Sequence, residues 1–338
     1  MSGRYSFTSR VGFGLWPNMP FRDAVISVKE AEKRGFESTW IVESTLNPGK
    51  DAVSYLGALA VSTERIQLAT GVITPFSRSI TLIASTMATL DEISNGRIIL
   101  GIGTGHIQTS SYHSIDFRDP LIRIREYVEV FQQLINGSSV NHEGRCLRIQ
   151  NLKLNVHPIR QRIPVYLATV SEQLARIAGE IADGVIFIMT SPLRVGQLVN
   201  AVAAGAESAG RSISEVDVAC YLPCFMMEDR ETSLRAARHT VAGYGRSVFY
   251  RRLYRKMGYR KEADLVKDAW EKGDVENAIS QVPEPMARDL TVVGSPEECV
   301  RRIEEYRRIG VKLPIIQAFY GQGDLESNVM MCLRTFGT

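Results

Sequence analysis

Two glycine-containing stretches carry the pattern most suited to chemistry in this 338-residue sequence. Residues 68–75 read Leu-Ala-Thr-Gly-Val-Ile-Thr-Pro, and residues 101–106 read Gly-Ile-Gly-Thr-Gly-His. Each begins inside a short apolar run of the kind that forms a buried strand. Glycine leaves the backbone bare, so a flat ligand can approach the main chain closely at both places. The two stretches therefore predict a site for a planar cofactor.

Few ionisable side chains accompany these glycines. Among the residues expected at strand ends, only Glu43 and His106 are evident proton carriers. A glycosidase needs two carboxyl groups within roughly 5 to 10 Å of each other, and a metal-dependent hydrolase needs clustered His and Asp ligands. The five histidines are far apart in the sequence, so we expect no metal site. This inventory favours a bound redox cofactor that carries the difficult chemistry itself.

Eight short apolar segments, separated by helical patterns, must position these residues. They cover residues 11–15, 38–43, 65–70, 97–101, 165–168, 184–188, 216–222 and 313–319. Buried strands that alternate with helices predict a parallel sheet, and eight such units predict an α/β fold of the closed (β/α)8, or TIM-barrel, type. An open doubly wound sheet is the structural alternative, but no Gly-x-Gly-x-x-Gly follows the first segment.

Two stretches interrupt the regular alternation. Residues 141–164, after strand four, predict a short hairpin around Glu143 and Gly144. Residues 229 to about 286, after strand seven, have only a helical pattern and predict a helical insertion. We interpret residues 1–338 as a single domain with these two additions.

Composition excludes several classes of protein. Hydrophobic residues make up 44% and charged residues 23% of the chain, and the net charge is only +3. These values are typical of a globular protein and do not favour a nucleic-acid partner. No segment has about 18 uninterrupted apolar residues, so we expect no membrane span. The first ten residues lack the apolar run of a secretion signal, which favours a cytoplasmic location.

Four motifs give the chain a resemblance to the luciferase-like monooxygenase superfamily. They are Gly-Val-Ile-Thr-Pro at 71–75, Ala-Thr-Leu-Asp-Glu-Ile-Ser-Asn-Gly-Arg at 88–97 with the following Gly-Ile-Gly, Ala-Gly-Glu-Ile-Ala-Asp-Gly at 178–184, and Val-Val-Gly-Ser-Pro-Glu at 292–297. The third motif and Trp-Pro-Asn at 16–18 resemble most the branch that uses coenzyme F420, an 8-hydroxy-5-deazaflavin. Within that branch the chain is most similar to the methylenetetrahydromethanopterin reductases.

The resemblance implies a set of cofactor contacts. In this family a non-prolyl cis peptide in the turn after strand three backs the deazaflavin ring, and the helix that begins at Ser171 offers free N–H groups for the anionic tail. Carried over to this sequence, the implied contacts are Gly71, Val72, Ile73, Thr74, Gly103, Thr104, Ala168, Thr169, Val170, Ser171, Gly184 and Val185.

Several positions depart from the family pattern. Gly14 stands where the reductases have a glutamate that donates a proton, Glu43-Ser44 stands where the family commonly has Asp-His, and His106 replaces an aspartate. Ser171-Glu172 replaces a glycine-proline pair. We therefore expect a retained cofactor cradle and a rebuilt substrate half, in which Glu43 and His106 are the candidate catalytic residues. Glu43 could instead form an ion pair with Arg78.

Three functions follow from the resemblance. The first is an F420-dependent oxidoreductase that moves a hydride between the coenzyme and a small organic substrate, with 5,10-methylenetetrahydromethanopterin or a similar methylene-tetrahydropterin as the best guess. The second is an FMN-dependent monooxygenase, and the third is a non-catalytic flavin-binding relative. Homo-oligomers, dimers or tetramers, are common in the family and are expected here.

Overall fold

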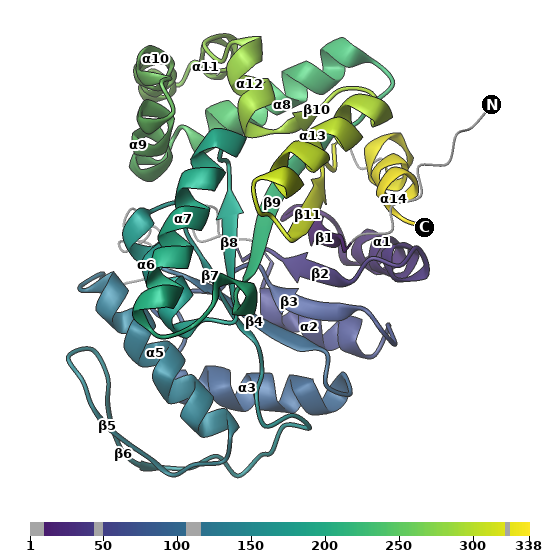
Figure 1. The fold of residues 1–338 in the computed structure, drawn as a ribbon. Coiled ribbons are helices and arrows are strands. Elements are labelled where there is room, and N and C mark those ends of the chain that lie inside the picture. Colours follow the sequence, from purple (N-terminus) through teal and green to yellow (C-terminus); the bar gives the residue numbers. More distant parts are fainter. Residues whose placement is uncertain (1–9, 44–49, 106–115, 322–324) are drawn as a thin grey trace.

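A closed barrel of eight parallel strands forms the centre of the molecule (Figure 1). The computed structural model describes residues 10–43, 50–105, 116–321 and 325–338. The strands are β1 (Gly12–Leu15), β2 (Ser38–Ile41), β3 (Gln67–Thr70), β4 (Ile98–Gly103), β7 (Val165–Ala168), β8 (Gly184–Ile188), β9 (Asp217–Phe225) and β11 (Leu313–Ala318). They pair in the order β9-β11-β1-β2-β3-β4-β7-β8, and the pairing of β8 with β9 closes the ring. The predicted (β/α)8 barrel is confirmed.

Large aromatic side chains fill the barrel because small residues face them. Trp40, Tyr166 and Tyr221 belong to the interior cluster, together with short or branched residues of neighbouring strands. A Cβ atom on Gly184 would lie 2.3 Å from Cε1 of Tyr166, so only glycine at this position leaves room for the ring. Alternation of large and small residues is how a barrel of this size is packed without a pore.

Helices cover the outside of the barrel (Figure 1). They are α1 (Phe21–Lys33), α2 (Ala52–Ala60), α3 (Ile80–Ile93), α5 (Pro120–Ile135), α6 (Glu172–Ile181), α7 (Pro192–Ser208), α13 (Pro296–Arg308) and α14 (Met331–Phe336), with a short 3₁₀ helix at Ile213–Glu215 and a π-helical turn at Glu326–Met330. Serine side chains cap several of them. Ser79, Ser171 and Ser191 each accept a hydrogen bond from the backbone three residues later. None of the helices within the described ranges is long and apolar enough to cross a membrane.

An antiparallel hairpin leaves the barrel between α5 and β7. Its strands are β5 (Val140–Glu143) and β6 (Arg148–Leu152), which agrees with the hairpin predicted around Glu143 and Gly144. The buried carboxylate of Glu126 on α5 accepts hydrogen bonds from the backbone N–H groups of residues 145, 146 and 147 in the hairpin turn. This one side chain therefore anchors the hairpin to the barrel.

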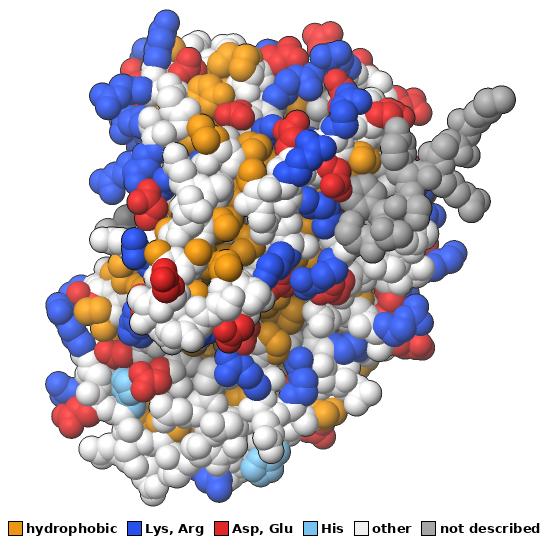
Figure 2. Space-filling view, viewed as in Figure 1, with side chains coloured by type: hydrophobic (Ala, Val, Ile, Leu, Met, Phe, Trp, Pro, Cys, Tyr) orange, Lys and Arg blue, Asp and Glu red, His pale blue; other side chains and the backbone are white. Residues whose placement is uncertain are grey.

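Five helices follow β9 before the chain returns to the barrel through β10 (Val292–Val293), which pairs with β9. They are α8 (Arg230–Tyr244), α9 (Val248–Lys256), α10 (Arg260–Glu271), α11 (Val275–Ser280) and α12 (Glu284–Leu290). They bury a core of their own, which also takes in Met189 and Phe225 at the carboxyl ends of β8 and β9. Basic side chains of α9 point outward and gather in the upper left of Figure 2, where Figure 1 shows α9 and α10.

Candidate functional site

The turn after β3 is the most specific feature of the barrel mouth. The peptide bond between Gly71 and Val72 is cis, as the resemblance implied. Backbone hydrogen bonds hold the turn on both sides: Gly71 N–H donates to the carbonyl oxygen of Ile41 at 2.7 Å, and Ile73 N–H donates to that of Gly101 at 3.1 Å. The turn is therefore fixed between β2 and β4.

Two glycines of β4 make room for this turn. A Cβ atom on Gly101 would lie 2.0 Å from the carbonyl oxygen of Thr70, and one on Gly103 would lie 3.0 Å from Cγ2 of Val72. The Thr70 hydroxyl also bonds both the carbonyl oxygen and the N–H of Gly101, at 2.7 and 2.8 Å. Gly101 is thus required by its close contact with the backbone of Thr70, and Gly103 by its tight contact with the Val72 side chain.

The remaining predicted residues of β3 and β4 lie beside the turn. The Thr74 hydroxyl lies 3.3 Å from the carbonyl oxygen of Thr104 and donates to it. Gly105 has a φ of +69° and packs against the same threonine side chain. The structure therefore brings Val72, Ile73 and Thr74 together with Gly103 and Thr104 at one edge of the mouth.

The start of α6 forms a second, polar edge. Ala168 ends β7, the Thr169 hydroxyl accepts a hydrogen bond from Ser171 N–H at 2.9 Å, and Ser171 caps α6 by accepting from the N–H of residue 174. Val170 is buried and packs against the five-helix core. The helix N-terminus of α6, with its positive dipole end, is suited to an anion.

A buried arginine, which the sequence did not single out, lies next to this helix start. Arg194 on α7 is only 6% exposed, and its Nη1 donates to the Glu172 carboxylate at 2.7 Å. This ion pair, above all its hydrogen bond, lowers the pKa of Glu172 below the ordinary value. Nε and Nη2 of Arg194 are buried and have no hydrogen-bond partner among the described residues. A cation with two unused donors fits an anionic ligand.

Gly184 and Val185 lie away from the barrel mouth, which disagrees with the cofactor contact predicted for them. They are the first two residues of β8, at its amino end, whereas ligands of such barrels bind at the carboxyl ends of the strands. The Tyr166 ring covers Gly184, and the Val185 side chain packs in the core between strands and helices. Their motif marks the junction of helix and strand, and their role in the structure is packing.

Glu43 is held in an ion pair. Its Oε2 accepts from Nη2 of Arg78 at 2.8 Å, and the same guanidinium also contacts the Asp51 carboxylate. The alternative considered for Glu43, pairing with Arg78, is therefore present in the structure. His106 and Ser44 lie outside the described residues. No cluster of three or more His, Cys, Asp or Glu side chains in the described parts of the chain is placed to hold a metal.

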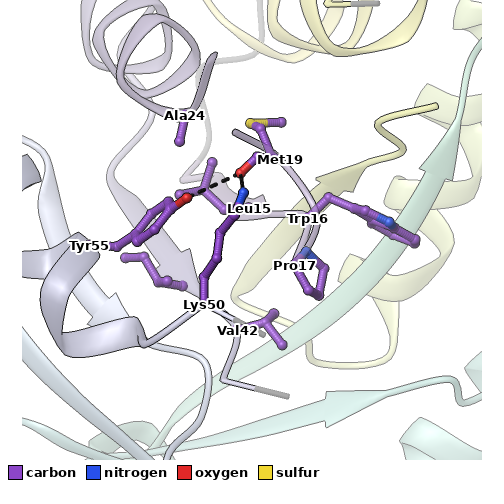
Figure 3. Close-up of a pocket in the computed structure, with 9 residues that line it drawn as sticks. Leu15, Trp16, Pro17, Met19, Ala24, Val42, Lys50 and Tyr55 are labelled. Carbon is purple, nitrogen blue, oxygen red and sulfur yellow. Dashed lines mark hydrogen bonds between the residues drawn. The ribbon is translucent and has the colours of Figure 1, made fainter. Parts of the chain in front are cut away.

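A small, mostly apolar pocket opens between the ends of β1 and β2 and helix α2 (Figure 3). It is lined by Leu15, Trp16, Pro17, Met19, Ala24, Ile41, Val42, Lys50 and Tyr55. Figure 3 shows the Lys50 ammonium and the Tyr55 hydroxyl converging on the Met19 carbonyl oxygen, which the hydroxyl reaches at 3.2 Å. Trp16 and Pro17 belong to the Trp-Pro-Asn motif singled out in the sequence, whereas no sequence motif pointed to Lys50 and Tyr55.

No side chain fits at Gly14, where the resemblance implied a glutamate in the reductases. A Cβ atom there would lie 2.7 Å from Cε1 of Tyr221 and 3.2 Å from Cβ of Gln317. The phenol ring of Tyr221 occupies this part of the interior. Glycine at position 14, in place of the implied glutamate, therefore goes together with the large side chain of Tyr221.

The fold and the mouth geometry place the chain in a known family. The family model for luciferase-like monooxygenases matches residues 3–313. The chain belongs to the luciferase-like monooxygenase family. This agrees with the resemblance found in the four sequence motifs.

Within the family, two similar proteins are reductases of the same name from different organisms. The chain is 31% identical over 306 residues to 5,10-methylenetetrahydromethanopterin reductase of Archaeoglobus fulgidus, covering 89% of this chain and 91% of that protein. It is 32% identical over 308 residues to the reductase of the same name from Methanopyrus kandleri, with 86% of each chain covered. The structure of the coenzyme F420-dependent tetrahydromethanopterin reductase from M. kandleri superimposes with a TM-score of 0.86 at 28% identity, covering 98% of both chains.

Proposed function

We propose that this chain is a coenzyme F420-dependent oxidoreductase that transfers a hydride between the coenzyme and a small organic substrate. The observation that carries the proposal is the turn at Gly71 and Val72, which β4 can approach only because Gly101 and Gly103 have no side chains. Relatives that are 31% and 32% identical over most of the chain are named methylenetetrahydromethanopterin reductases. A methylene-tetrahydropterin is therefore the substrate we propose.

The mouth has the two features that this coenzyme requires. A planar ring needs bare backbone at van der Waals distance, which the turn after β3 and the two glycines of β4 offer. A phosphate-bearing tail needs donors and positive charge, which the N-terminus of α6 and the two unpartnered nitrogens of Arg194 offer. When bound, F420 would supply the hydride through its deazaflavin ring.

The protein's own side chains and backbone would bind and orient the coenzyme and the substrate. Residues 71–74 would support one face of the ring, with Gly103 and Thr104 beside them, and residues 168–171 would hold the tail together with Arg194. The pocket lined by Trp16, Val42 and Lys50 would receive part of the substrate. Glu43 and His106 would exchange a proton with the substrate, and Arg78 would fix the Glu43 carboxylate for that task.

An anaerobic turnover assay tests this function. Purified protein is mixed with reduced F420 and methylene-tetrahydromethanopterin, and the return of oxidised F420 is followed by its absorbance. We expect oxidation of the coenzyme that depends on both protein and pterin. Reduced FMN with oxygen is the parallel assay. Oxygen consumption with FMN, together with no oxidation of F420 by the pterin, would refute the proposal in favour of a monooxygenase.

A further inference from the structure

Two buried oxygen atoms face the upper interior of the barrel without hydrogen-bond partners. One is the hydroxyl of Tyr221 on β9, and the other is Oε1 of Gln317 on β11. Their residues are only 3% and 2% exposed, so bulk water does not reach the two oxygens. Neither oxygen finds a donor or acceptor among the described residues.

The two side chains meet beside the glycines of the mouth. The Tyr221 ring extends from β9 past Gly14 on β1, where a Cβ atom would lie 2.7 Å from Cε1 of the ring. Its hydroxyl ends against Gly71, where a Cβ atom would lie only 2.2 Å from the phenol oxygen. Gln317 follows Ile316, which pairs with Phe13, and a Cβ atom on Gly14 would lie 3.2 Å from Cβ of Gln317. The hydroxyl therefore lies directly against the turn that carries the cis peptide.

A second tyrosine of the interior has a hydroxyl with a hydrogen-bond partner and serves as a comparison. Tyr166 also packs over a glycine, Gly184, but its hydroxyl donates to Asp217 at 2.7 Å. A buried hydroxyl without a partner is unfavourable, and phenylalanine would fill the same space without that penalty. A buried polar group that is kept without a partner in the free protein calls for an explanation, of which a bound ligand is one.

We propose that Tyr221 and Gln317 recognise the lactam edge, –CO–NH–, of a heterocycle bound at the barrel mouth. The Tyr221 hydroxyl donates to the lactam carbonyl oxygen, and Gln317 Oε1 accepts from the lactam N–H. Both oxygens are shielded from bulk water in the free protein. Binding therefore uncovers the Tyr221 hydroxyl beside Gly71 and turns the Gln317 side chain, which has three rotatable bonds, toward the mouth. The assignment rests on the proposed function, because a deazaflavin and a pterin both carry such an edge.

The charge state of the phenol suits this role. Burial, and next the proximity of Tyr244, raise the pKa of Tyr221 well above its ordinary value. The phenol stays neutral at physiological pH and remains a hydrogen-bond donor. A neutral pair can bind a neutral lactam without placing a charge in the barrel interior.

Three variants test the proposal: Tyr221→Phe, Gln317→Met and, as the matched control, Tyr166→Phe. For each, the melting temperature of the free protein is measured, together with Kd for F420 from its absorbance and Kd for tetrahydromethanopterin from tryptophan quenching. We expect Tyr221→Phe to keep or raise the melting temperature and to weaken the binding of one of the two ligands about tenfold. Gln317→Met should behave in the same way. Tyr166→Phe should lower the melting temperature and leave both Kd values unchanged.

The ligand that loses affinity identifies the source of the lactam edge: F420 for the coenzyme ring, the pterin for the substrate. Unchanged Kd values for both ligands in Tyr221→Phe would overturn the assignment. Weaker binding accompanied by a lower melting temperature would also overturn it, because that result indicates a structural role. Wild-type protein that binds neither ligand would overturn the proposed function, and with it this assignment, before any variant is compared.

Discussion

Replacing Gly103 by alanine should displace the turn after β3. The new Cβ atom would lie 3.0 Å from Cγ2 of Val72 and 3.5 Å from the carbonyl oxygen of Ala168. The contact with Val72 is tighter than nearly all Cβ contacts in proteins, so the Val72 side chain must give by a few tenths of an ångström. Overpacking of this kind destabilises a protein by about 1 to 3 kcal/mol.

The variant should also lose activity. Misplacement by about 1 Å of groups that position a substrate can cost about 100-fold in rate. The shift expected here is smaller, so Gly103→Ala should lower kcat/KM by about tenfold. The matched control is Gly196→Ala on α7, where a Cβ atom meets nothing within 4 Å. It should keep wild-type activity and gain up to about 1 kcal/mol in stability from helix propensity.

Two quantities test whether the turn supports the coenzyme: Kd for F420 and kcat/KM. Each is compared among wild type, Gly103→Ala and Gly196→Ala. A folded Gly103→Ala protein with wild-type values of both would refute the view that the turn supports the coenzyme. A loss of activity in Gly196→Ala would show that the assay responds to glycine replacement in general.

Four further substitutions give distinct results. Burial raises the pKa of Glu126, but three backbone N–H donors outweigh it and hold that pKa below its ordinary value of 4.5. Glu126 therefore stabilises the fold fully above that value and less as the pH falls through the lower folded pKa. Glu126→Gln should lower the free energy of unfolding by about 1 to 3 kcal/mol at neutral pH, and the difference should shrink in acid denaturation below about pH 4; a difference that is constant with pH would contradict this. Arg194→Met should weaken F420 binding at least tenfold but leave the binding of a deazaflavin without an anionic tail unchanged, and equal losses for both would exclude a tail contact. Glu43→Gln and His106→Ala should each be assayed for kcat, where loss of a general acid or base costs about 100-fold or more; near-normal turnover in both would remove them as catalytic residues.

The fold was predictable because the strands of a parallel barrel are buried on both faces. Such strands form continuous apolar runs between turn residues, and all eight were located to within a few residues. The largest difference is at β9, which was expected to end at Leu222 but continues to Phe225. Pro223 offers no backbone donor, yet the strand continues because Cys224 and Phe225 pair with β10. A proline alone did not mark the end.

The site was predictable only where local backbone geometry dictates the residue. Gly101 and Gly103 stood out because glycine is needed where a neighbouring backbone or side chain approaches closely, and the cis turn lies where the family motif implied. The unpartnered groups of Tyr221 and Arg194 were not predictable, because a missing partner is a property of the folded surroundings. The contact predicted for Gly184 came from the family resemblance alone, whereas the expected strand at 184–188 already put it at the amino end, away from the mouth.

A titration of the purified protein with F420 and with FMN, each oxidised and reduced, tests the central claim most directly. Tryptophan quenching and cofactor absorbance report binding independently of turnover. We expect saturable binding of F420 at micromolar concentration and much weaker binding of FMN. Preferential binding of FMN would contradict the assignment of the barrel mouth to a deazaflavin.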